Sequence, residues 1–272
     1  KRQDDFTLDT IHKLEEDGMA DKTQGLVFAG DDLINNSGDK TLDVGKSDTD
    51  DIHMNTGFAG VTDTDHINIK DGLEFVLVGK TDKDGKPSGD KLLSDAENGG
   101  SVHVNTGTLT LGSNGVKDKT GGTLAEVVLD EQGNLVIKNG DFTVERIESD
   151  GTLHVTGGGS LTSNDVTLDK GDSKIDEGGV LVVEDGESNG NLHIKGDGAL
   201  TNEGTLIAGG KDSHVDTLVD GDLVNKGTGL YDDMTITNGG HYHNTSTGKD
   251  AGDRIDVAEG GKWTNDGQSS WG

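Results

Sequence analysis

A motif that the chain repeats four times constrains its fold more than any other feature of the sequence. In each copy a histidine lies between two apolar residues and is followed by polar residues and glycine. The four histidines occupy positions 53, 103, 154 and 193. Internal periods of about 20–50 residues are typical of solenoids, in which each repeat packs on its neighbours. The copies are IHMNTG (52–57), VHVNTG (102–107), GTLHVTGGGSLTSN (151–164) and GNLHIKGDGALTNE (190–203).

A second series, with the pattern apolar-x-Asn-x-Gly, runs through the C-terminal part of the chain. The units LTNEG, LVNKG, ITNGG and WTNDG place asparagines at positions 202, 225, 238 and 265. Successive asparagines are 23, 13 and 27 residues apart, and skipping Asn238 leaves 40 residues between Asn225 and Asn265. Together the two series predict a structural coil of roughly 20–25 residues, with insertions in some coils.

Within each unit the apolar residues alternate with a period of two. Leu153 and Val155 flank His154, for example, and this alternation predicts a strand with one buried face. Clusters of Gly, Asn and Asp end the short runs and supply turns. The best helical candidate is 6–16. We therefore predict an all-β fold, a right-handed parallel β-helix over 25–272, with 1–24 as an N-terminal cap or partly ordered segment.

Composition is consistent with a slender solenoid. Hydrophobic residues make up 29% of the chain and the net charge is −29, values that in other contexts indicate disorder. A solenoid needs few inward positions per coil, and its narrow interior explains why aromatic residues are only 3%. At a strand spacing of about 4.8 Å, roughly 12 coils would form a rod some 55–60 Å long.

Charge and residue usage argue against nucleic acid and membranes as partners and indicate the cellular compartment. The 52 acidic residues against 23 Lys and Arg repel phosphate backbones and anionic lipid, so we expect neither nucleic-acid binding nor membrane contact. The chain has no cysteine, which suits a protein exported through an oxidising compartment. It has no apolar run long enough to span a membrane and no signal peptide, so we expect a mature chain.

The repeated histidines lie between inward apolar neighbours, which predicts that His53, His103, His154 and His193 point outward. Copies roughly 40–50 residues apart would lie about two coils, or ~10 Å, from one another on one repeated strand. Two imidazoles at that separation cannot share a zinc ion. We therefore interpret these histidines as structural.

Metal-binding candidates are few, and no cofactor is predicted. The clusters DTDD and DTDH could hold a weakly bound surface Ca²⁺ if loop carbonyls assist, although solvated turns are the favoured interpretation. The HYH motif (241–243) places His241 and His243 on one strand face, where a third ligand would be needed to bind a metal. The candidate calcium ligands are Asp48, Asp50, Asp51, Asp63 and Asp65.

No catalytic residue is predicted. The motifs G-x-S-x-G and H-E-x-x-H and the P-loop are absent from the sequence. Polysaccharide-active β-helices use paired carboxylates and usually aromatic platforms for sugar rings, and the chain has only 2 Trp, 2 Tyr and 5 Phe.

Three segments resemble a known family. GTLHVTGGGSLTSN (151–164), GNLHIKGDGALTNEGTLIAGG (190–210) and VAEGGKWTNDG (257–267) resemble the degenerate Gly-Asn-Leu repeats of AIDA-type autotransporter passenger domains. The apolar-x-Asn-x-Gly units are also similar to filamentous-haemagglutinin-type exoproteins. The resemblance covers roughly 50–272. It implies a passenger fragment at the surface of a Gram-negative bacterium, outer-membrane-anchored or secreted, with no catalytic centre and with roles in adhesion, autoaggregation, biofilm formation and virulence.

The expected partners are passengers on neighbouring cells, a host matrix protein or a glycan. Outward Asn, Thr and Asp ladders would supply many weak polar contacts, which become strong when they are repeated along a rod. Self-association at a net charge of −29 would require bridging cations or charge-asymmetric faces. The alternatives are a polysaccharide-active β-helix (a lyase, a hydrolase or a tailspike-like module) and a passive stalk.

Overall fold

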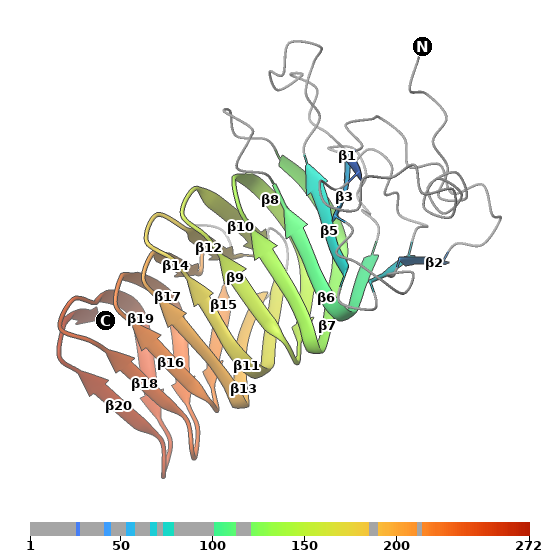
Figure 1. Cartoon of the computed structure of the whole chain (residues 1–272). Helices are drawn as coiled ribbons and strands as arrows, with labels where there is room; N and C mark the ends of the chain where they lie inside the picture. Colours follow the sequence, from blue (N-terminus) through green and yellow to red (C-terminus); the bar gives the residue numbers. More distant parts are fainter. Residues whose placement is uncertain are drawn as a thin grey trace.

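Parallel β-strands account for the regular structure of the described chain, which confirms the predicted parallel β-solenoid. Figure 1 shows the coils stacked along one axis in chain order, from β6 to β20. The described part of the chain contains no helix, and therefore no helix that is long and apolar enough to cross a membrane. The predicted helix candidate at 6–16 and the predicted cap at 1–24 lie outside the described residues. The computed structural model describes residues 26–27, 41–44, 53–57, 66–69, 73–78, 101–112, 121–184, 190–210 and 214–272.

The strand registers divide each coil into three short strands, which stack into three parallel sheets that we call A, B and C in chain order. Long strands bend from one sheet into the next. From residue 101 onward, register partners in successive coils are between 17 and 27 residues apart along the chain. Leu218 and Thr235 give the shortest separation, and Lys174 and Thr201 give one of the longest. These separations bracket the predicted coil of roughly 20–25 residues. About seven turns are described, so the predicted total of twelve coils stays a prediction.

Sheet A carries the candidate functional site described below. Its strands are β2 (Thr41–Val44), β4 (His66–Ile69), the first parts of β6 (Ser101–Leu111), β11 (Asp165–Ile175) and β13 (Gly190–Asn202), the middle of β7 (Gly121–Ile137), β15 (Val215–Val219), and the last parts of β8 (Gly140–Ser149), β17 (Thr228–Ile236) and β19 (Lys249–Val257).

Sheets B and C complete each coil. Sheet B contains β1 (Leu26–Val27), β3 (His53–Gly57), β5 (Leu73–Val78), the last parts of β6, β7, β11 and β13, and β9 (Thr152–Val155), β16 (Asp222–Asn225), β18 (His241–Asn244) and β20 (Lys262–Asn265). Sheet C contains the first parts of β7, β8, β17 and β19, and β10 (Gly159–Ser163), β12 (Val180–Val183), β14 (Thr205–Ala208) and β21 (Gln268–Trp271).

The core is a column of side chains inside the three sheets. In the described strands from β6 to β18, residues at alternating positions are buried for most of each strand, as period-two patterning predicts, and most of the buried residues are Val, Leu or Ile. The interior nevertheless admits large rings, because Tyr242 and Phe142 are its largest fully buried side chains. Tyr231 is also buried, and Gly229 makes room for it, since a Cβ at position 229 would lie 2.6 Å from the Tyr231 hydroxyl. The expectation that large rings fit the interior poorly is therefore wrong near the C-terminal coils.

An inward row of sheet B changes from aliphatic residues to asparagines along the rod. Leu111, Ile137, Val155 and Ile175 occupy its first positions, and asparagines occupy the next four. The Nδ2 atom of each of the first three asparagines donates to Oδ1 of the next asparagine at 2.8–2.9 Å. The first three also donate to a backbone carbonyl, that of Thr228, Lys249 or Gln268. The row is Asn202, Asn225, Asn244 and Asn265.

This row corrects the prediction that asparagine ladders face outward. Asn202, Asn225 and Asn244 are fully buried, because the amide donors find partners inside the coil. The sequence pattern had included Asn238, which lies on a turn outside this row, and had missed Asn244. The glycine of the motif allows close stacking of coils, since a Cβ on Gly227 would overlap the carbonyl oxygen of Gly204.

Candidate functional site

The repeated histidines form clips between successive coils. His103, His154 and His193 point outward between buried neighbours, as predicted, whereas the side chain of His53 lies outside the described residues. In each clip the histidine Nε2 contacts the aspartate located two residues beyond its register partner in the next coil. The pairs are His103–Asp130 (2.9 Å), His154–Asp176 (2.7 Å), His193–Asp220 (2.6 Å) and His243–Asp266 (2.9 Å).

The prediction that these histidines repeat on one strand, two coils apart, is wrong. His103 and His193 lie on sheet A, whereas His154 lies on sheet B. From His103 the register runs through Val128 to Glu148, and His154 follows past the corner between the sheets. The interval from His103 to His154 therefore amounts to two coils and a fraction of a third.

The HYH motif occupies sheet B near the C-terminal end of the rod. Tyr242 points into the core, and the rings of His241 and His243 stack outside it with centroids 6.0 Å apart, which confirms their common face. Partial burial, followed by the nearby charge of Lys262, holds the pKa of His241 below its ordinary value. In the described part of the chain no carboxylate completes a three-ligand group with these two rings.

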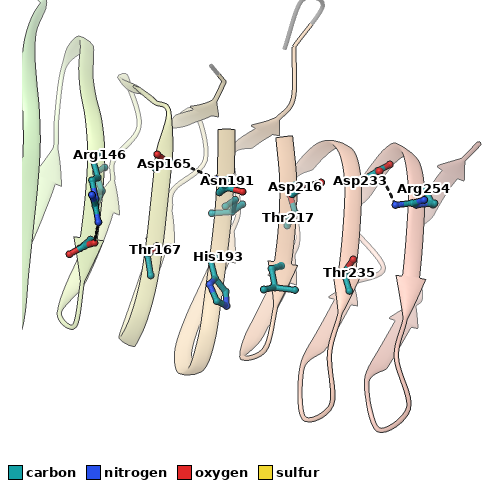
Figure 2. Close-up of a pocket in the computed structure, with 14 residues that line it drawn as sticks. Arg146, Asp165, Thr167, Asn191, His193, Asp216, Thr217, Asp233, Thr235 and Arg254 are labelled. Atoms are coloured by element: carbon teal, nitrogen blue, oxygen red, sulfur yellow. Dashed lines mark hydrogen bonds and ion pairs between the residues drawn. The ribbon is translucent and has the colours of Figure 1, made fainter. Parts of the chain in front are cut away.

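A groove with a volume of about 680 Å³ runs along sheet A. Two outward rows of side chains line it, one row at each of two outward positions of the stacked strands, as Figure 2 shows. Short threonine side chains in the second row leave space between the longer ones. The first row is Arg146, Asp165, Asn191, Asp216, Asp233 and Arg254, and the second is Glu148, Thr167, His193, Leu218 and Thr235.

Charge is arranged along the groove with a cation at each end. Arg146 pairs with Glu148 and lies 3.7 Å from Glu126, and the hydrogen bond to Glu148 raises the pKa of the guanidinium. At the other end Arg254 contacts Asp233 at 3.0 Å and Asp256 at 3.1 Å. Carboxylates and an amide occupy the first row between the two arginines, so the middle of the groove is acidic.

Within the acidic middle, neighbouring coils are linked by polar contacts. Asn191 Nδ2 donates to Asp165 Oδ1 at 3.0 Å, which joins two coils. His214 Nε2 lies 3.1 Å from Asp216 Oδ1 and 3.6 Å from Asp233 Oδ2. Such a surface can accept and donate many hydrogen bonds at a spacing of about 4.8 Å along the rod.

The predicted calcium ligands Asp48, Asp50, Asp51, Asp63 and Asp65 lie outside the described residues, so that prediction is not tested. His214 had no motif in the sequence to mark it, because one of its two carboxylate neighbours, Asp233, is brought to it from the next coil by strand stacking.

Comparison with known proteins gives a similar solved structure. No family model and no curated protein matches the chain. The chain is similar to the crystal structure of a TibA fragment with TibC-catalysed hyper-glycosylation, at 15% identity and a TM-score of 0.30. The match covers 86% of this chain and 95% of that chain.

Proposed function

We propose that this chain is part of the passenger of an AIDA-type autotransporter adhesin, a rod at the surface of a Gram-negative bacterium. The single observation that carries the proposal is the pair of polar rows on sheet A, which present side chains at matching positions over successive coils. The Gly-Asn-Leu repeat pattern and the parallel β-solenoid support the same assignment.

The form of the groove favours an extended partner. Its lining comes from consecutive coils of one sheet, so the contacts available to a partner recur with the strand spacing of about 4.8 Å. Each polar contact is weak on an exposed surface, but contacts linked along one rod, and between many rods on facing cells, act together. We propose that the partner is a second copy of the rod, a matrix protein or a glycan.

The lining of the groove supports a binding role over catalysis. It has no Trp, Tyr or Phe to stack on a sugar ring. All four of its carboxylates are engaged within the protein. Asp165 accepts a hydrogen bond from Asn191, and Asp216 contacts His214. Glu148 and Asp233 pair with the two arginines at the ends of the groove. We therefore propose an adhesive function without catalysis, and incubation with a panel of acidic glycans tests this, since cleavage products would contradict it.

The test displays residues 1–272 on the surface of non-clumping bacteria and measures settling and attachment to matrix-coated wells. We expect display to cause settling or attachment. The double variant Arg146→Glu/Arg254→Glu should reduce it at least several-fold, because both ends of the groove reverse their charge. The matched control, Lys138→Glu/Lys249→Glu, makes the same change in net charge outside sheet A and should behave as the parent chain.

Two outcomes would contradict the proposal. If displayed cells neither settle nor attach, the described rod is a passive stalk. If both double variants lose adhesion equally while their circular-dichroism spectra stay unchanged, adhesion depends on total charge and the groove on sheet A is not the contact surface.

A further inference from the structure

His214 departs from the rule that the other histidine–aspartate pairs follow. In the four clips the aspartate lies in the next coil, two residues beyond the register partner of the histidine. His214 instead contacts Asp216, two residues further along the chain, and also faces Asp233 in the next coil. One imidazole nitrogen therefore lies near two carboxylates, whereas in each clip it contacts one aspartate.

Strand stacking brings the two carboxylates together. Asp216 on β15 and Asp233 on β17 are register partners, and both side chains point outward from sheet A. One ligand atom from each of the three residues lies within 4.8 Å of the others. A metal ion bound tetrahedrally by nitrogen and oxygen at about 2.0–2.2 Å separates its ligand atoms by roughly 3.4 Å. The observed 3.1 and 3.6 Å from His214 Nε2 to the two carboxylate oxygens fit that value.

The local charge also favours a cation. Asp232 adds a third carboxylate to this corner, where its Oδ2 accepts a hydrogen bond of 2.9 Å from the backbone N–H of Val215. The opposing cation is Arg254, which pairs with Asp233. Arg254 also contacts Asp256 at 3.1 Å, so it keeps a carboxylate partner when Asp233 turns toward a metal ion.

We propose that His214, Asp216 and Asp233 bind one divalent transition-metal ion of the zinc class. An imidazole nitrogen with two carboxylate oxygens suits Zn²⁺ and similar ions, whereas Ca²⁺ takes six to eight oxygen ligands and Mg²⁺ an octahedron of oxygens. His214 and Asp216 are about half exposed, so the ion is reached from solvent and keeps a coordination position open toward the groove. The site stands independently of the adhesive function, since it needs only this chain.

Isothermal titration of the whole, metal-free chain with ZnCl₂ tests the site. We expect one equivalent to bind more tightly than the background of surface carboxylates, and His214→Ala to weaken that binding at least tenfold. Asp216→Asn should do the same while leaving the Arg254–Asp233 pair intact. The matched control is His193→Ala, which removes another outward histidine of sheet A and should leave zinc binding unchanged.

Thermal unfolding provides a second readout, because an ion that binds only the folded chain raises its Tm. Zinc should raise the Tm of the parent chain and of His193→Ala, but not that of His214→Ala, and an equal concentration of CaCl₂ should not reproduce the rise. Circular dichroism without metal establishes that each variant is folded. The proposal is overturned if the parent chain shows no saturable zinc site, or if His214→Ala and Asp216→Asn, both folded, bind zinc as the parent does.

Discussion

The side-chain amide of Asn225 donates a hydrogen bond of 2.9 Å to Oδ1 of Asn244 in the next coil, although both residues are fully buried. Burial of an amide is unfavourable unless its donors and acceptors are paired, and stacking at matching positions pairs those of Asn225 and Asn244. A row of identical polar residues can therefore replace part of an aliphatic core, and it helps to keep the coils in register.

Replacing Asn225 with leucine should destabilise the solenoid. The change leaves Asn244 Oδ1 and the carbonyl of Lys249 without their donor, and Asn202 without its acceptor in this row. Loss of partners for buried polar groups costs about 1–3 kcal/mol, measured as the free energy of unfolding in urea. Asn238→Leu, the same change on a turn outside the row, should stay within about 0.5 kcal/mol. Equal effects of the two variants would show that the row contributes nothing.

The histidine clips should matter less for stability than the apolar residues beside them. His154 and Asp176 are both partly exposed, and ion pairs at such positions contribute about 0–1 kcal/mol. Leu153 is buried, and its replacement by alanine should cost about 2–5 kcal/mol. Urea unfolding of His154→Ala and Leu153→Ala compares the two contributions directly. A larger loss from His154→Ala would mean that the clip, and not the core, holds this coil.

Acid should weaken two of the clips. Partial burial raises the pKa of Asp176, but hydrogen bonds from Lys174 and His154 outweigh it, and the net pKa lies below its ordinary value of 3.8. Asp220 behaves alike, with Thr237 among its donors. A carboxyl whose pKa is lower in the folded state stabilises the protein above pH ~4, and that stabilisation is lost as pH falls through the folded pKa.

The Tm measured from pH 7 to pH 2 should therefore fall below about pH 4. In the double variant Asp176→Asn/Asp220→Asn the acid-induced decrease should be smaller than in the parent chain. An unchanged decrease in the variant would mean that other carboxyl groups cause it.

Both tyrosines of the chain should resist ionisation while the protein is folded. Tyr231 and Tyr242 are the only two, and burial is the main cause that raises the pKa of each well above 10. Tyr242 also donates a hydrogen bond of 2.6 Å to the buried Asp250. Because the folded-state pKa is raised, the stabilisation by the neutral hydroxyls is present below about pH 10 and is lost at higher pH.

Absorbance at 295 nm during alkaline titration reports this directly. We expect tyrosinate to appear only together with unfolding, as followed by circular dichroism. Gradual ionisation near pH 10 in a protein that stays folded would contradict the buried cluster. The same titration in denaturant, where both hydroxyls should ionise near pH 10, is the control.

Adhesion by the displayed chain should depend on ionic strength. At a net charge of −29, facing rods repel one another unless cations bridge them or oppositely charged parts of the groove meet. Settling should change when NaCl is varied from about 20 to 500 mM, or when CaCl₂ or a chelator is added. Settling that ignores all of these would remove electrostatics from the proposed mechanism.

Local patterning could be read from the sequence with good accuracy. The alternation around His103, His154 and His193 predicted their outward direction, because side-chain direction in a strand depends only on the parity of neighbouring residues. The coil length followed from the repeat spacing, and the all-β solenoid followed from both. These properties depend on residues close together in the chain, so the sequence alone determined them.

The position of each residue around the coil is decided by the tertiary structure. His103 and His154 fall on different sheets because the chain between them makes two coils and a fraction of a third. Asn225 can occupy an inward position because its donors meet acceptors in the next coil. Asp216 meets Asp233 because a whole coil of chain returns the strand to the same place, one strand spacing further along the sheet. The groove and the His214 site are products of this inter-coil register, which no local pattern in the sequence specifies.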